Sequence, residues 1–341
     1  MTTPLASTTS AATGKIPGHA ASVSPLITGW RREAALRLGA GLDVARHFGE
    51  TGLIELDGQP LSLHPLGEEP AGPWLAVTRA ARPAAVAEEV WCDALLLATG
   101  QTLVASHAAF GLNDDGEAVL ILRTAAGHEH PDLLAVELAG LLQLRQALLE
   151  GVQAPAAAPV IHTGAVEAAP GGGDGGGAAG APFLEAPERV LVRVHEALLQ
   201  AGLPAEEALA GARSGAFTLD GLSIGLACED ETGTLVVVAD LGAEALDTPE
   251  RRRLALQANT TLMVFAGVAV ARERGRARLM SRCPVDGRSA VDFADSFAVW
   301  LRDFARLARA TSDSRDTDSR DTASRDTASR DTASRDTAAA H

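Results

Sequence analysis

The residues best placed to bind a metal lie in the stretch HEHPD, where His128, His130 and Asp132 stand close together. Imidazole and carboxylate groups at such spacing are common metal ligands. The stretch precedes a long amphipathic segment, however, and an aspartate in the first turn of a helix stabilises the helix N-terminus. We therefore interpret HEHPD as a loop followed by a helix start, and we expect no metal site.

The nucleophile candidates do not form a catalytic pattern either. Cys92, Cys228 and Cys283 are scattered and have no CxxC spacing, which is typical of buried thiols in a reducing compartment. His195 lies on an apolar helix face and is interpreted as a packed or half-exposed side chain. GLSIG (221–225) matches the letters of G-x-S-x-G, but it lies in an expected strand rather than at the strand-to-helix turn that exposes a nucleophilic serine. The glycine-rich stretch PGGGDGGGAAG lacks the Lys-Ser/Thr ending of a phosphate-binding loop. We expect no catalytic residues, no cofactor and no enzymatic activity.

Composition limits the partners that the chain can have. Its 341 residues carry a net charge of −15, which argues against nucleic acid or an anionic membrane as the main partner. No run of about 18 apolar residues occurs, and the N-terminus lacks the apolar core of a signal peptide, so we expect no membrane insertion. Heavy use of Ala, Gly, Leu and Arg is typical of GC-rich bacterial genomes. These features predict a cytoplasmic bacterial protein.

Three segments are too poor in large apolar residues to form a core. They predict a disordered N-terminal tail (1–25), a Gly/Ala/Pro-rich linker (153–187) and a disordered C-terminal tail (312–341). The last tail repeats SRDTA every five residues, a period that suits neither helix nor strand. Expansion of a DNA repeat explains it, and a docking role is the alternative. Two globular domains of nearly equal length remain, 26–152 and 188–311.

The two domains are related by an internal repeat. The glycines of two hairpin turns, Gly116 and Gly275, are 159 residues apart. The same offset aligns apolar residues in the preceding helix, in the hairpin and in the following helix, and repeated core positions of this kind indicate a duplicated domain. Among the aligned pairs are Leu95 with Leu254, Leu97 with Leu256, Leu103 with Leu262 and Leu120 with Leu279.

Each copy has the same predicted order of elements: helix, three strands, helix, two strands, helix. In the first copy, the three helices are expected at 30–48, 82–99 and 131–152, with a hairpin between 103 and 125. Strands that alternate with turns such as Asp57-Gly58 predict antiparallel pairing. The predicted fold class is α+β, with one face of each sheet covered by helices and the other requiring a partner or water.

This order of elements resembles the CesT/Tir family of type III secretion chaperones. The second copy carries the resemblance over about 120 residues through LQAN (256–259), an apolar hairpin, SRCPVDG (281–287) and FADSFAVWLRDFARL (293–307). In the family pattern, a Leu-rich helix ends near Ala-Asn, and a short proline-containing loop joins the hairpin to a final helix with aromatic residues. The first copy departs from this pattern, because LATG (97–100) replaces Ala-Asn and TAAGHEHPD replaces the proline-containing loop.

The resemblance implies a non-enzymatic bacterial virulence protein that binds the N-terminal region of a secreted effector and keeps it soluble and ready for export. Members of the family are homodimers, so two tandem copies imply an internal pseudo-dimer, and further oligomerisation stays open. One alternative is a regulator or scaffold that binds components of the export apparatus through the same fold. Another is an enzyme whose site the sequence does not reveal.

The resemblance also assigns roles to apolar residues. Pairing of the two copies through their second helices, at about 82–99 and 248–265, would involve Leu95, Leu96, Leu254 and Leu256. The expected partner-binding residues are apolar side chains on exposed strands and helix grooves, together with arginines of the second hairpin. They are Trp30, Trp74, Val119, Ile121, Val236, Val238, Arg276 and Arg278.

The two hairpins differ in charge at their tips. Alternation places Arg276 and Arg278 on the outer face of the second hairpin, which has Arg272 and Arg274 at its tip. The first hairpin has Asp114, Asp115 and Glu117 at its tip. One hypothesis is that unlike charges meet and favour pairing between the two copies over pairing of like copies. The other is that the arginines form a solvated edge that discourages aggregation between strands.

Overall fold

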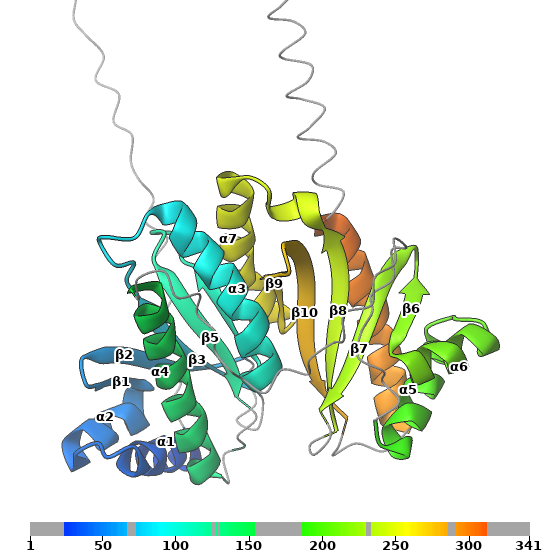
Figure 1. Ribbon diagram of the computed structural model, residues 1–341. Coiled ribbons are helices and arrows are strands. Elements are labelled where there is room, and N and C mark those ends of the chain that lie inside the picture. The colour runs from blue at the N-terminus through cyan, green and yellow to red at the C-terminus, as the bar shows by residue number, and fades with distance from the viewer. Residues whose placement is uncertain are drawn as a thin grey trace, which may run out of the picture.

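The protein was analysed as a computed structural model, which describes residues 24–66, 73–124, 127, 130–153, 186–229, 233–285 and 291–311. The chain forms two α+β domains in tandem, each with a five-stranded antiparallel sheet, so the predicted fold class is confirmed (Figure 1). The segments predicted as tails and linker lie outside the described residues, apart from a few residues at their ends, and His128 of the HEHPD stretch lies outside them too.

The first domain contains the elements from α1 to α4. These are α1 (Pro25–Arg37), α2 (Leu42–Thr51), β1 (Leu53–Leu56), β2 (Gln59–Pro65), β3 (Trp74–Ala80), α3 (Glu88–Ser106), β4 (Ala108–Leu112), β5 (Ala118–Thr124) and α4 (Pro131–Gln153).

The second domain repeats this order. It contains α5 (Glu188–Gln200), α6 (Ala205–Ser214), β6 (Ala216–Leu219), β7 (Leu222–Glu229), β8 (Thr234–Gly242), the short 3-10 helix η2 (Ala243–Leu246), α7 (Pro249–Phe265), β9 (Val268–Glu273) and β10 (Arg276–Pro284). Residues 291–311 form its last helix.

The N-terminal helix predicted at 30–48 is in fact two helices, α1 and α2, and in the second domain a further helix, α6, follows α5. In the first domain the chain leaves α1 through Gly39, whose φ of 85° lies in the left-handed region that glycine tolerates best. In the second domain Gly202 has a φ of 101°, and Pro204 precedes the first residue of α6. The sequence analysis did not predict α6. The helix expected at 82–99 also lies later in the chain, at Glu88–Ser106.

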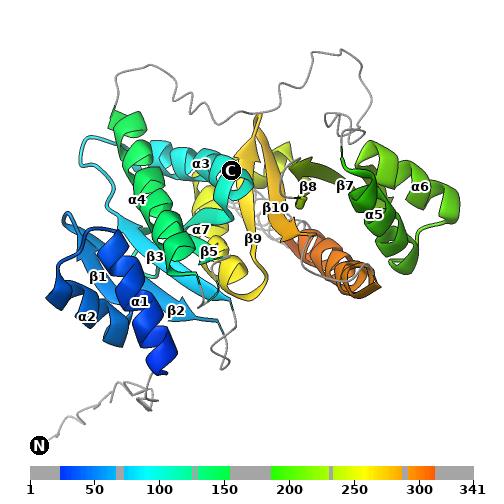
Figure 2. The same ribbon diagram turned by 90° about the horizontal axis from the view of Figure 1, so that it is seen from below.

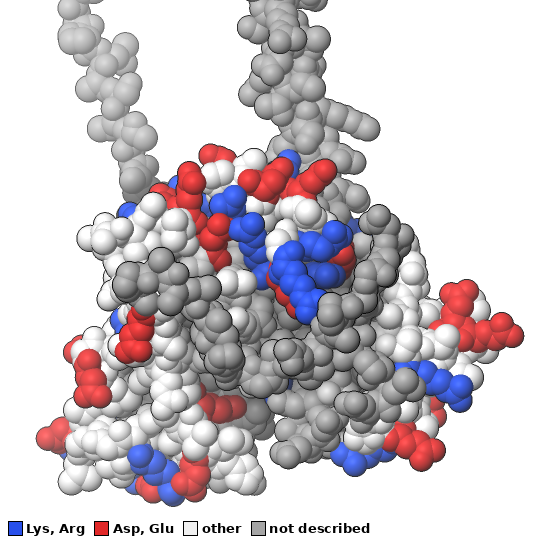
Figure 3. All heavy atoms as spheres, viewed as in Figure 1, with Lys and Arg blue, Asp and Glu red and all other residues white. Residues whose placement is uncertain are grey.

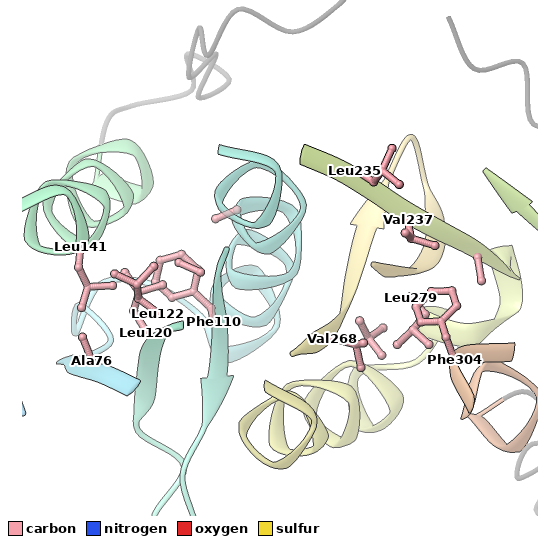
Figure 4. Close-up of a cluster of buried hydrophobic side chains, with 14 of the residues drawn as sticks. Ala76, Phe110, Leu120, Leu122, Leu141, Leu235, Val237, Val268, Leu279 and Phe304 are labelled. Atoms are coloured by element: carbon pink, nitrogen blue, oxygen red, sulfur yellow. The ribbon is translucent and has the colours of Figure 1, made fainter. Parts of the chain in front are cut away.

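The two sheets have the same strand order, β1-β2-β3-β5-β4 and β6-β7-β8-β10-β9, and all strand pairs are antiparallel. Helices cover one face of each sheet (Figure 2). Figure 4 shows Leu141 of α4 pointing toward Leu120 of β5, and Phe304 of the last helix beside Leu279 of β10. Burial of these apolar faces is the main source of each domain's stability.

The described helices were also tested against the requirements of a bilayer. None of them combines the length and the apolar character that a membrane-spanning helix requires.

Candidate partner-binding surfaces

The first surface is the seam at which the two domains pack together. Helices α3 and α7 contact each other, and each also packs on the edge strand of the other domain's sheet: α3 on β9, and α7 on β4 (Figure 1). Each helix therefore has its own sheet on one side and the partner domain's sheet on another. The edge strands β4 and β9 are covered in this way, which removes two unpaired strand edges from solvent.

Small residues allow this close packing. A Cβ atom added at Gly111 of β4 would lie 2.5 Å from Thr260 Oγ1 of α7 and 3.0 Å from the Leu256 carbonyl oxygen. A Cβ atom at Gly100 of α3 would lie 3.5 Å from the Cβ of Ala271 on β9. Glycine is unfavourable inside a helix. A distance of 3.5 Å is an ordinary van der Waals contact, so the close approach of the two domains requires glycine at Gly111 and not at Gly100.

Hydrogen bonds tie the middle of the seam together. The side-chain amide of Asn259 donates to the Phe110 carbonyl of the other domain at 3.0 Å and to the Val270 carbonyl at 2.9 Å, and its oxygen accepts from the Val270 N–H at 2.7 Å. The Thr260 hydroxyl donates to the Leu112 carbonyl at 3.0 Å. Asn259 is fully buried, so its three bonds satisfy groups that water cannot reach.

The seam also corrects the alignment of the two copies. Thr99 accepts from the Phe110 N–H at 3.1 Å, just as Asn259 accepts from the Val270 N–H, so these residues are equivalent at an offset of 160 rather than 159. The reason lies in the hairpin turns. Residues 113–117 separate the paired Leu112 and Ala118, whereas only 273–276 separate Arg272 and Ala277. The shorter second turn shifts the preceding strand and helix by one residue.

This shift explains the position of the residues expected to pair the domains. Leu95, Leu96 and Leu256 are fully buried, but Leu254 is 60% exposed, because the residue of α7 equivalent to Leu95 is Ala255. The sequence analysis aligned Leu103 with Leu262 and did not assign Leu103 or Met263 to the seam. These two residues are equivalent at the offset of 160 and belong to one buried cluster. That cluster contains Leu75, Leu103, Ala109, Val119, Ile121, Val236, Met263, Ala269, Ala271 and Met280.

One end of the seam is closed by a histidine and two arginines. His107 ends α3, and its Nε2 lies 3.1 Å from the carbonyl oxygen of Gly267, its equivalent in the second domain. Burial is the main reason why the pKa of His107 falls to about 4, and the charges of Arg123 and Arg282 lower it further. Arg123 donates to the Met263 carbonyl at the end of α7 at 3.2 Å. Arg282 donates to the Ala105 carbonyl near the end of α3 at 2.7 Å.

The other end of the seam carries ion pairs. Asp93 of α3 accepts hydrogen bonds from Arg272 at 2.6 Å and from Arg252 at 3.3 Å. The Glu88 carboxylate lies 4.0 Å from Arg253. Figure 3 shows basic side chains gathered near this end with acidic ones beside them. These contacts place unlike charges together across the seam. Arg272 of the second hairpin tip takes part, but its partner is Asp93 of α3 and not the acidic tip of the first hairpin.

Other charged residues of the two hairpins pair within their own domains. Arg276 and Arg278 pair with Asp240 of the neighbouring strand at 2.7 and 3.4 Å, and Glu117 pairs with Arg79 at 3.2 Å. Burial would raise the pKa of Asp240, but hydrogen bonds from Arg276 and the Gly242 N–H, with the charge of Arg278, lower it. A partner-binding role for Arg276 and Arg278 stays a prediction.

The apolar candidates for partner binding lie mostly inside the protein. Trp30 and Trp74 are 3% and 4% exposed and pack on each other, with ring centroids 5.5 Å apart. Val119 and Ile121 are buried in the seam cluster with Val236, and the half-buried Val238 packs on that cluster. In this conformation the two indoles and the three buried aliphatic side chains present very little surface to a partner.

A groove on the first domain offers more accessible apolar surface. It has a volume of about 960 Å³ and lies against the face of the first sheet opposite α1 and α4, beside the part that α7 covers. Side chains of β1, β2, β3 and β5 form its floor, and α2 contributes one wall. The lining residues are Asp43, Val44, His47, Leu53, Ile54, Glu55, Pro60, Leu61, Ser62, His64, Val77, Arg79, Asn113 and Val119. Val44 and Leu53 are 43% and 49% exposed, so an apolar ligand would bury them further.

The groove contains one pair of groups that resembles catalytic machinery. His64 Nε2 lies 2.9 Å from the Ser62 hydroxyl oxygen. Burial lowers the pKa of His64, and the charge of Arg31 lowers it further. A general base that activates a serine becomes positively charged, and a nearby carboxylate normally stabilises that charge. A cation near His64 has the opposite effect, so the arrangement does not favour nucleophilic catalysis.

Metal binding and thiol chemistry find no support in the described part of the chain. There, no group of three or more His, Cys, Asp and Glu side chains is arranged to hold a metal ion. Cys92 is buried, and burial, together with the nearby Glu88 and Asp93 carboxylates, raises the pKa of its thiol. A raised pKa disfavours the reactive thiolate.

Comparison of the chain with protein-family models, with curated proteins and with solved structures gives no match.

Proposed function

We propose that the protein is a non-enzymatic chaperone that holds an extended segment of another polypeptide in the first-domain groove. Following the resemblance to the CesT/Tir family, the segment is the N-terminal region of an effector exported by a bacterial type III secretion system. The chaperone acts in the cytoplasm as an internal pseudo-dimer and keeps the effector ready for export.

The groove is the observation that carries this proposal. Its floor is the sheet face that points away from α1 and α4, and apolar side chains such as Val44, Leu53 and Val77 alternate there with polar ones. A surface of this kind suits an extended peptide that places alternate apolar side chains in it. The carboxylates of Asp43 and Glu55 lie among the lining residues, so a basic residue in the segment would find a partner there.

The edge of the sheet beside the groove adds a second element of binding. β1 is an outer strand that pairs only with β2 within its sheet. A peptide that adds a strand to β1 would gain backbone hydrogen bonds, while its side chains on one face enter the groove. Main-chain pairing gives affinity for many sequences, and the apolar contacts give selectivity.

The alternative is a scaffold that uses the same surfaces to bind components of the export apparatus. The two functions differ in what they retain. A chaperone retains a secreted protein through its N-terminal region, whereas a scaffold retains apparatus proteins whether or not a secreted protein is present.

The test is affinity purification of the full chain from a bacterium with an active type III export system, followed by intact-mass measurement of the complex. The expected result is one secreted protein that is no longer retained when its N-terminal region is deleted. A matched sample carries Leu53→Glu and Val44→Glu in the groove and should lose the same protein. Retention of apparatus proteins alone would favour the scaffold, and an unchanged complex in the groove variant would contradict the proposed site.

A further inference from the structure

The charges at one end of the seam are divided unequally between the two domains. The first domain contributes only carboxylates to the ion pairs there, from Glu88 and Asp93. The second contributes only guanidinium groups, from Arg252, Arg253 and Arg272. Each pair described at this end joins one domain to the other: Asp93 with Arg252, Asp93 with Arg272, and Glu88 with Arg253.

The internal repeat shows that the carboxylates and the guanidinium groups occupy equivalent ends of α3 and α7 in the two domains. Equivalent residues of the two domains face each other across the seam, as His107 and Gly267 do at the opposite end. At the same offset of 160, Asp93 corresponds to Arg253 and Cys92 to Arg252. The charged end of α3 and the charged end of α7 therefore occupy equivalent positions around a pseudo-two-fold axis, with opposite sign.

The same geometry can be applied to two like domains. Two copies of the first domain would bring both Asp93 side chains and both Glu88 side chains to this end of the seam, without the three arginines. Two copies of the second domain would bring together two sets of Arg252, Arg253 and Arg272. Like charges placed together across an interface oppose association and select against the wrong partner.

We propose that these charges make the seam selective for unlike domains, so that the pairing surface of the first domain accepts the second domain and rejects another first domain. The natural occupant is the second domain of the same chain, which the covalent connection keeps at high effective concentration. This inference goes beyond the proposed function and does not depend on it. The wild-type chain is expected to be a monomer.

The test uses two full-length variants with complementary charge reversals. Variant A carries Asp93→Arg, so its own seam would place a third guanidinium group beside Arg252 and Arg272. Variant B carries Arg252→Asp and Arg272→Asp, so its own seam would place Asp93 beside two further carboxylates. A third variant combines all three substitutions in one chain. The control is Asp303→Arg, which reverses a carboxylate that pairs with Arg306 on the exposed surface of the last helix.

Variants A and B alone are expected to unfold at a Tm about 4–8 °C below that of the wild type. Co-expressed, they should form a 1:1 complex of twice the monomer mass in native mass spectrometry. In that complex, each first domain meets a second domain of opposite charge. The triple variant should return to the monomer mass and recover most of the lost Tm, and the control should change Tm by less than about 2 °C.

Two results would overturn the proposal. One is an unchanged Tm for A and B with no mixed complex, which would mean that the charges do not influence pairing. The other is a triple variant as unstable as B, which would mean that the substitutions act through local structure rather than through the sign of the charges. Circular dichroism of each variant below its Tm confirms that folded protein is being compared.

Discussion

Thr99 and Asn259 occupy equivalent positions on α3 and α7, and each accepts a hydrogen bond from the backbone N–H of the strand that follows its helix, at 3.1 Å from Phe110 and 2.7 Å from Val270. Asn259 has an additional amide group, which reaches the Phe110 carbonyl of the other domain. Thr99 thus bonds within the first domain, whereas Asn259 bonds both within the second domain and across the seam to the first.

Asn259→Ala is expected to lower the free energy of unfolding by about 3 kcal/mol, because it leaves the buried Val270 N–H and the buried Phe110 and Val270 carbonyls with fewer partners. Asn259→Thr should lose less, since a threonine there can still accept from Val270, as Thr99 does from Phe110. Urea denaturation measures both. Gln257→Ala, at a half-buried position of the same helix, is the control. A loss below about 1 kcal/mol for Asn259→Ala would show that the bridge contributes little.

Gly111→Ala is expected to destabilise the protein, because the new Cβ would lie 2.5 Å from Thr260 Oγ1 and 3.0 Å from the Leu256 carbonyl. Overpacking of this kind costs about 1–3 kcal/mol. Gly140→Ala is a control of opposite sign, since no atom lies within 4 Å of its added Cβ and alanine favours a helix by up to about 1 kcal/mol. Thermal unfolding of both variants gives the comparison, and equal Tm values would contradict close packing at Gly111.

The seam should be sensitive to mild acid through His107. Its pKa in the folded protein is about 4, below the unperturbed value of about 6.5, so the unfolded chain binds the proton more readily. Stability from this group is full above about pH 6.5 and declines as the pH falls toward about 4, by up to about 3 kcal/mol. His107→Asn, which tolerates the left-handed backbone at this position, should flatten the pH dependence of the unfolding free energy.

Two further observations separate His107 from other acid-sensitive groups. The pKa of His64 is also lowered, so His64→Asn should remove a smaller part of the dependence in the same direction. The pKa of Asp240 is lowered as well, but from a carboxyl value near 3.8, so its contribution is lost below the range in question. A wild-type stability that does not change between about pH 7 and 4.5 would contradict the role of His107.

Groove variants should change binding without changing the fold. Leu53 and Val44 are 49% and 43% exposed, so glutamate at either position costs little stability but places a charge where an apolar segment would bind. We expect at least roughly a tenfold loss of affinity for a bound polypeptide, measured by titration calorimetry. Leu209→Glu on α6 is a matched control, because this leucine is 41% exposed and lies outside the groove. Equal losses in both variants would point to a nonspecific effect of charge.

The arrangement of elements could be predicted because it follows from patterns within each copy. Apolar periodicity, turn residues such as Asp57-Gly58 and the repeated spacing predicted two antiparallel sheets with helices on one face. The predicted alignment of the two copies was wrong by one residue where α3 and β4 are matched with α7 and β9. The comparison was anchored on Gly116 and Gly275 and allowed no gap. It therefore could not show that the second turn is one residue shorter, because the length of each turn is fixed by which strand residues pair.

The surfaces were harder to predict, because exposure depends on the second domain. Alternation correctly separated Val119 and Ile121 from the inward-facing Leu120, but it could not show that α7 and the second sheet bury that other face. Trp30 and Trp74 were expected to bind a partner, yet they pack on each other within the first domain. The groove depends on the position of α2, and the sequence analysis merged that helix with α1.

The hydrogen bond that only Asn259 makes, and the groove described on the first domain, have a consequence for stoichiometry. A homodimer must display every binding surface twice, and its clients can arrive in pairs. A chain whose halves have diverged around a shared axis is free to display a surface once. Under the proposed function, a chain with one such groove would bind one polypeptide, where a homodimer with the same groove would bind two.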